Sequence, residues 1–126
     1  MRLALTTLVV PDYDQAIAFY VGILGFELRE DTRLTDEKRW VVVAPRQSEG
    51  ALLLARAANE AQRAAIGHQT GGRVAFFLET DDFARDHATW RDRGVRFVRE
   101  PVREAYGTVA VFTDPWGNLW DLIEPA

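Results

Sequence analysis

The chain of 126 residues contains no cysteine, one methionine and two histidines. The absence of cysteine excludes disulfides, thiolate nucleophiles and zinc–thiolate sites. Basic residues are not in excess either, because 15 Lys and Arg stand against 19 Asp and Glu, which gives a net charge of −4. The sequence therefore lacks the positive charge by which proteins bind nucleic acids.

Long hydrophobic runs are also missing, and no apolar segment approaches the length needed to cross a membrane. The N-terminal MRLALTTLVVPDYD has one arginine and a short apolar run, as a signal peptide does. No small-residue cleavage site follows, so we interpret it as the first strand. We therefore expect a cytoplasmic protein with no membrane and no nucleic-acid partner.

The first half of the chain predicts the order β-α-β-β-β. Pro11 and Asp12 close a strand, and apolar residues at helical spacing then continue to Gly25, which suits a helix C-terminus. The polar segment 30–38 is expected to be a loop. The expected strands cover residues 3–10, 26–29, 39–44 and 51–55.

The second half repeats this order after the glycine-rich segment 67–72. A helix capped by Asp81 or Asp82 and ended by Gly94 is expected, and segment 100–106 is expected to be a loop. We interpret the repeat as an internal duplication within a single domain, 1–126. Its parts are the modules 1–58 and 73–126 and the linker 59–72; the second module's expected strands cover residues 73–80, 95–99, 107–113 and 119–123.

The stretch TDPWGNLWDLIE, Thr113–Glu124, predicts a turn followed by the last strand. Asp114 can accept hydrogen bonds from nearby backbone N–H groups, and Pro and Gly suit the turn that follows. Strand alternation puts Trp120 and Leu122 on the core face and Asp121 on the opposite, largely apolar face. We therefore expect Asp121 to lie near the functional site.

Two stretches, DYDQAIAFYVGILGF and TDPWGNLWDLIEP, are similar to motifs of the vicinal oxygen chelate superfamily. This superfamily includes glyoxalase I, bleomycin-resistance proteins and extradiol dioxygenases, and the resemblance covers nearly the whole chain. It implies an α+β fold in which tandem βαβββ modules form cupped mixed sheets. It also implies a homodimer whose site binds a small molecule.

The resemblance also bears on metal binding. Metal-using relatives take four ligands from the first and last strands of the two modules. The resemblance puts these positions on Leu5, near Leu53, on Ala75 (or, with a two-residue slip, Arg73) and on Asp121. Three of the four carry no donor atom, and one carboxylate does not make a catalytic metal site. This pattern implies no metal and no cofactor, and it argues against metal-dependent glyoxalase I activity.

Strand alternation and side-chain chemistry suggest which residues line the cup. If Ala75 faces it, then Arg73, Phe77 and Glu79 share its side, and the same parity places Thr7 of the first strand there. Arginines suit a carboxylate or phosphate, and aromatic rings suit a planar group, although the same rings also suit a dimer interface. The candidate ligand-binding residues are Thr7, Arg39, Trp40, Leu53, Arg73, Phe77, Arg103 and Tyr106.

Two functions stay open. The first is metal-independent binding of a small, partly apolar molecule, for which the acidic composition favours a cationic ligand. The second is a lyase, isomerase or dioxygenase-type enzyme with Asp121 or Glu79 as the catalytic base, because an apolar cup raises the pKa of a carboxyl group. A less favoured form of the second keeps a metal through Asp121, Glu79 and His68.

Overall fold

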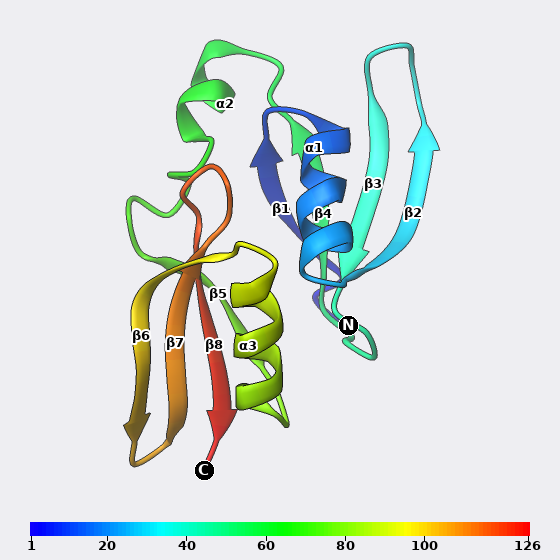
Figure 1. Cartoon of the computed structure of the whole chain (residues 1–126). Helices are drawn as coiled ribbons and strands as arrows, with labels where there is room; N and C mark the ends of the chain where they lie inside the picture. The colour runs from blue at the N-terminus through cyan, green and yellow to red at the C-terminus, as the bar shows by residue number, and fades with distance from the viewer. The chain divides into compact units, whose positions relative to one another are not determined.

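The structure is a computed structural model that describes residues 1–126, and the chain divides into two compact units, 1–66 and 67–126. Each unit contains one four-stranded mixed sheet (Figure 1). The predicted α+β class and the repeated βαβββ order are confirmed. No helix is both long and apolar enough to span a membrane.

The first unit has the strand order β1-β4-β3-β2, in which β1 runs parallel to β4 and the other neighbours are antiparallel. The helix after β1 packs on β3 and β4, and the side chains of Leu8 in β1, Val43 in β3 and Leu54 in β4 are fully buried. The elements are β1 (Leu5–Val10), α1 (Tyr13–Ile17), the π-helix η1 (Ala18–Ile23), β2 (Glu27–Arg33), β3 (Arg39–Ala44), β4 (Ala51–Arg56) and α2 (Glu60–Ala65).

The first helix changes its winding along its length. Asp12 caps its N-terminus, because a carboxylate oxygen accepts from the backbone N–H of Gln15 at 2.9 Å. After Ile17 the winding becomes that of a π-helix, and the N–H of Leu24 donates to the carbonyl of Phe19, five residues earlier. Gly25 then ends the helix with a φ of +83°, as its sequence position predicts.

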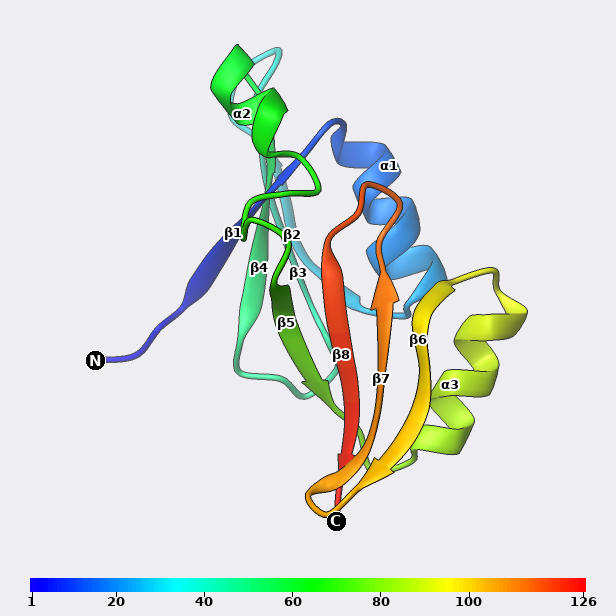
Figure 2. The same cartoon turned by 90° about the vertical axis from the view of Figure 1, so that its left-hand side faces the viewer.

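The second unit has the strand order β5-β8-β7-β6, and α3 lies along one side of this sheet (Figure 2). Trp120 and Leu122 are buried on the side of α3, as predicted from alternation, and the rings of Trp120 and Phe112 stack at 5.9 Å. The elements are β5 (Val74–Glu79), α3 (Phe83–Asp92), β6 (Arg96–Glu104), β7 (Gly107–Thr113) and β8 (Leu119–Pro125).

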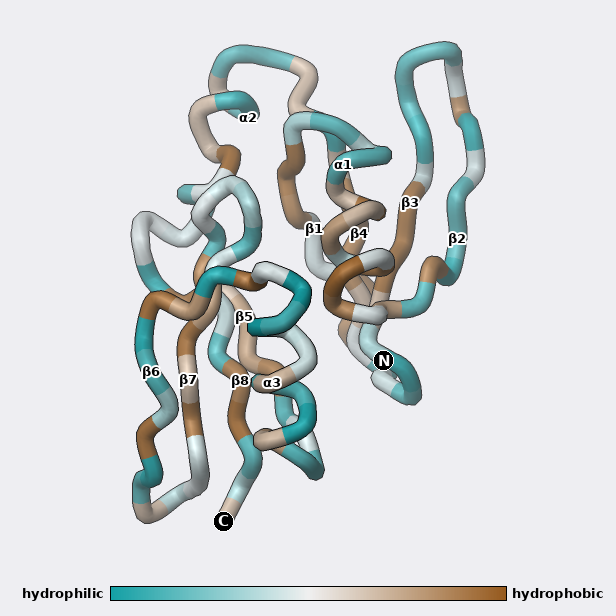
Figure 3. Tube along the Cα trace, in the orientation of Figure 1, coloured by the Kyte–Doolittle hydropathy of each residue, from teal (hydrophilic) through white to brown (hydrophobic).

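Two segments that were expected to be loops are partly strand. Strand β2 continues to Arg33, into the expected loop 30–38, and β6 continues to Glu104, into the expected loop 100–106. Both are edge strands, and β2 is hydrophilic along most of its length (Figure 3). Edge strands are often charged, which discourages pairing with other chains, so polarity alone did not separate them from loops.

His87 on α3 is held among aromatic rings. Its ring lies 5.5 Å from that of Phe83 and 4.3 Å from that of Phe97, and its buried Nε2 has no hydrogen-bond partner. Burial lowers the pKa of His87 below its usual 6.5; the nearby Arg91 acts in the same direction and Glu100 opposes it. His87 is therefore a packing residue in its neutral form.

Acidification is expected to destabilise the protein through His87. The unfolded chain takes up this proton near pH 6.5, whereas the folded chain does so only at lower pH, so stability is lost as the pH falls from 6.5 through the folded pKa. His87→Gln should reduce the fall in melting temperature between pH 7.5 and 5.5, measured by circular dichroism. His68→Gln, at an exposed site, is the control. Equal slopes for the two variants would contradict the prediction.

Candidate ligand-binding site

The side of each sheet away from the helix that follows its first strand (α1 or α3), here called its helix-free face, carries several of the candidate residues. In the second unit, strand pairing aligns one row of side chains across this face. Phe77 lies opposite Asp121, and Val111 separates Asp121 from Arg99. Phe77 is 67% exposed, unusual for a large apolar side chain, so the row offers an aromatic surface beside a carboxylate.

Asp121 is half-buried, and its surroundings change its acidity. Burial raises the pKa of Asp121 above its usual value, and Arg99 partly offsets this. Its carboxylate has no hydrogen bond or ion pair in the structure. A carboxylate in such a place can bind a ligand's cationic or donor group, and it can also act as a general base.

The other candidates of the second unit lie at different distances from this row. Glu79 is exposed and pairs with Ile123, one row further along β5 and β8. Arg73 precedes β5, and a register shift between Val74 and Phe76 interrupts the alternation used to place it. Arg103 and Tyr106 lie at the tip of the β6–β7 hairpin, so they are separated from Asp121 along the strands.

The first unit has an equivalent row with different chemistry. Thr7 of β1 pairs with Leu53 of β4, Leu53 pairs with Val42, and Glu30 of β2 completes the row. By topology, Leu53 corresponds to Asp121 and Thr7 to Phe77. The two units therefore present different polar groups at matching positions.

Arg39 and Trp40 are neighbours in sequence but face opposite sides of β3. The guanidinium of Arg39 pairs with Asp14 at 2.8 Å and Asp31 at 2.7 Å, and it lies 5.2 Å from the ring centre of Tyr13. The hydrogen bond from Arg39 holds the pKa of Asp31 below its usual value. Arg39 thus links β3 to β2 and to α1, while Trp40 lies on the helix-free face.

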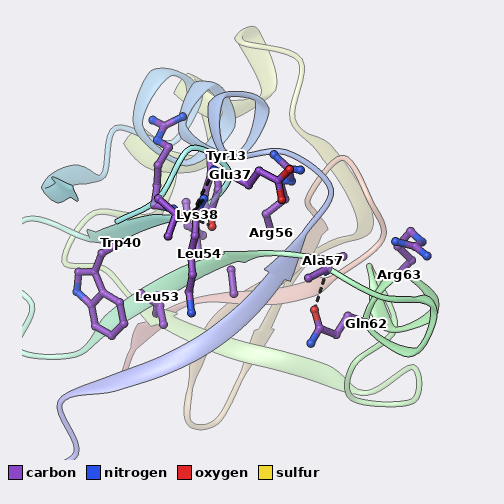
Figure 4. Close-up of a pocket in the computed structure, with 14 residues that line it drawn as sticks. Tyr13, Glu37, Lys38, Trp40, Leu53, Leu54, Arg56, Ala57, Gln62 and Arg63 are labelled. Carbon is purple, nitrogen blue, oxygen red and sulfur yellow. Dashed lines mark hydrogen bonds between the residues drawn. The ribbon is translucent and has the colours of Figure 1, made fainter. Parts of the chain in front are cut away.

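A cavity of about 550 Å³ lies within the first unit, beside the start of β3 and the end of β4. Figure 4 shows Trp40 and Leu53 on one side of this cavity, and Gln62 and Arg63 of α2 on another. Gln62 is fixed in place, since its side-chain oxygen accepts from the N–H of Ala58 at 2.7 Å. Two predicted ligand-binding residues, Trp40 and Leu53, therefore meet in one cavity, which Arg39 also lines.

The structure contains no group of three or more His, Cys, Asp or Glu side chains that could hold a metal ion. Asp121, Glu79 and His68 are accordingly not gathered into one. Leu53 is paired with Thr7 of β1, and Asp121 is paired with Phe77 of β5, so neither neighbour supplies a carboxylate or an imidazole. The helix-free faces therefore offer hydroxyl, aromatic and single carboxylate groups for binding.

Sequence reasoning missed several residues beside the candidates. Arg99 was not singled out, because a register shift between Phe97 and Arg99 hides the side to which it belongs. Lys38, Arg56 and Arg63 line the cavity of the first unit although they are far apart in sequence. Their only signal was polarity next to short strands, which is typical of any solvated surface.

The chain is similar in sequence to several known proteins. Residues 2–122 match the family model described as the Glyoxalase/Bleomycin resistance protein/Dioxygenase superfamily. An uncharacterised protein of Shewanella frigidimarina is 56% identical over 119 residues, which are 93% of this chain and 88% of that protein.

Two solved structures are similar along nearly their whole length. UcmS2 is 34% identical, with a TM-score of 0.85 and 98% of each chain covered. TnmS3, described as an antibiotic binding protein from Streptomyces sp. CB03234, is 30% identical with a TM-score of 0.80, and the match covers 100% of this chain and 97% of that one.

Proposed function

Because the chain belongs to the Glyoxalase/Bleomycin resistance protein/Dioxygenase superfamily, we propose that it binds a small, partly apolar molecule without transforming it. The site lies on the helix-free face of the second unit, around Asp121. The observation that carries the proposal is the exposed ring of Phe77 beside the half-buried carboxylate of Asp121. Ligand sites combine such apolar surface with a few polar groups that fix orientation.

The likeness to TnmS3 supports this proposal, since that protein is described as binding an antibiotic and shares 30% identity with this chain. A shared fold alone does not fix function, so the residues of the site carry the proposal. We further propose that both units form one domain and that the protein acts as a cytoplasmic homodimer.

A second candidate function is an enzyme in which Asp121 is the general base. The observation that favours it is the raised pKa of Asp121, because a base works best when its pKa approaches the working pH. Glu79, one row away, could take part in proton transfer. The two functions differ in one outcome: a binding protein releases its ligand unchanged.

Native mass spectrometry of protein purified without chelator tests both functions. A dimer carrying a small organic mass, recovered unchanged after incubation and denaturation, supports the binding function. A changed mass supports the enzyme. One divalent ion per chain would overturn the metal-independent form of both.

2-Naphthylmethylamine, which joins an aromatic ring system to a cationic amine, is the probe for this site. Replacing Asp121 with asparagine is expected to weaken its binding about tenfold, because a charge-assisted hydrogen bond contributes about 1.5–3 kcal/mol. Phe77→Ala should weaken it as well, through lost ring contact. Isothermal titration calorimetry at pH 7.5 measures both effects. Asp81→Asn is the matched control, since the Asp81 side chain is 93% exposed and lies outside the row. Equal affinities for the Asp121 and Asp81 variants would remove Asp121 from the proposed site.

A further inference from the structure

The two sheets differ in how completely their third and fourth strands pair. In the second unit, β7 and β8 form seven residue pairs, from Gly107↔Pro125 to Thr113↔Leu119. In the first unit, β3 and β4 form only three, from Val43↔Leu52 to Val41↔Leu54. Beyond Val41 the two strands have no pairing with each other, although β3 stays paired with β2 and β4 with β1.

The cavity of the first unit lies at this separation. It is lined by Arg39 and Trp40 of β3, by Leu53 to Arg56 of β4, and by residues of the β2–β3 connection and α2. Trp40, Leu53 and Ala55 give it an apolar wall, to which Trp40 contributes a half-buried indole. The volume of about 550 Å³ lies within the range of small-molecule sites.

The charges around the cavity are mostly positive. Lys38, Arg56 and Arg63 line it, and their side chains have no hydrogen bond or ion pair within the protein. Arg39 is different, because Asp14 and Asp31 already neutralise it. Glu37 is the one acidic residue of the lining. A local excess of positive charge in a chain of net charge −4 favours an anion at this place.

We propose that this cavity binds a small aromatic carboxylate. Its ring lies against Trp40 and Leu53, and its carboxylate faces Lys38, Arg56 and Arg63. Arginine suits this task because its planar group donates two parallel hydrogen bonds to a carboxylate. The positive charge around this cavity therefore favours an anionic ligand, whereas the net negative charge of the whole chain suggests a cationic one. The site belongs to the first unit alone and does not depend on the function proposed for Asp121.

The test compares 2-naphthoate with 2-naphthamide, which has the same ring system without the charge, by calorimetry on the full chain. We expect naphthoate to bind about tenfold more tightly. The double variant Arg56→Gln/Arg63→Gln should lose this difference and bind both probes alike. The control is Arg46→Gln/Arg91→Gln, which removes two exposed arginines outside the cavity and should keep the full difference.

Two further variants locate the site. Trp40→Leu should weaken both probes, because each stacks its ring on the indole. Asp121→Asn should leave naphthoate affinity unchanged, so the failure of one proposed site is distinguishable from the failure of the other. The proposal is overturned if naphthamide binds as tightly as naphthoate to the unmodified chain, if the double variant matches its control, or if Trp40→Leu changes neither affinity. Melting curves of each variant establish that it is folded before titration.

Discussion

Replacing Asp114 with alanine is expected to lower the free energy of unfolding by about 3 kcal/mol, because one buried carboxylate organises the whole turn before β8. One oxygen accepts from the backbone N–H groups of Trp116, Gly117 and Asn118 at 3.0, 3.0 and 2.9 Å. The other accepts from the side-chain amide of Asn118 at 2.7 Å. Alanine would remove the acceptor of the Trp116 and Asn118 N–H groups and of the Asn118 side chain, which is buried; Gly117 would keep only its 3.2 Å bond to the carbonyl of residue 114.

Thermal unfolding followed by circular dichroism measures this effect, and a loss of this size lowers the melting temperature by roughly 10 °C or more. Asp81→Ala is the control, since that carboxylate is exposed and makes one surface ion pair with Arg85 at 3.3 Å. If Asp114→Ala melts within 2 °C of the control, the turn is held by something other than this carboxylate.

Replacing Gly67 with alanine is expected to cost about 3 kcal/mol or more, for two separate reasons. Gly67 has a φ of +73°, which side chains other than glycine rarely adopt. In addition, a Cβ on Gly67 would lie 1.8 Å from the carbonyl oxygen of Trp116, so backbone would have to move. The turn that Asp114 organises is therefore in close contact with Gly67, at the start of the second unit.

Gly71→Ala separates the two causes. Gly71 has nearly the same φ, +69°, but an added Cβ would meet nothing within 4 Å. Its substitution should cost about 1 kcal/mol from backbone strain alone. The difference between the two melting temperatures, measured under one set of conditions, reports the close approach to Trp116. Equal losses at the two glycines would show that this approach is not tight in solution.

The turn and the core of β8 could be predicted from sequence because local chemistry determines them. Asp114 and Gly117 have the turn roles expected from their types, and alternation put Trp120 in the core correctly. The helix ends were predictable to within a residue or two. Each helix had two candidate caps, Asp12 or Asp14 and Asp81 or Asp82; the structure uses Asp12 and Asp82, and Gly25 and Gly94 follow with positive φ.

Side-chain direction on the edge strands could not be predicted, because irregular pairing breaks the alternation. Register shifts occur beside Leu28 in β2, beside Phe97 in β6 and beside Val74 in β5. Each shift exchanges the two faces for the residues beyond it. The position of Arg73 was inferred across one such shift, and Arg99 was overlooked beside another.

The cavity of the first unit also depends on information that no local pattern contains. Its lining comes from β3, β4, the β2–β3 connection and α2, and it lies where two strands stop pairing. Residues 39–44 and 51–55 were correctly expected to be strands, but where their pairing would end was not predictable. That Lys38, Arg56 and Arg63 line one cavity is therefore visible only in three dimensions.

The π-helix of the first unit explains a difference in length between the two repeats. Tyr20 follows Tyr13 by seven positions, and Trp90 follows Phe83 by the same number. Gly25, however, follows Tyr13 by twelve positions, whereas Gly94 follows Phe83 by eleven.

The extra residue falls where η1 replaces regular α-helix, and a π-turn is the way in which a helix absorbs a single insertion without breaking. The hydrogen bonds agree, since the N–H of Phe26 reaches back six residues to Tyr20 and that of Val95 only five to Trp90. When the two halves are aligned, no gap is needed up to Tyr20 and Trp90. One gap is needed between these aromatic residues and the glycines Gly25 and Gly94. Under the internal duplication that the sequence suggests, the two modules differ by an insertion or deletion as well as by substitutions.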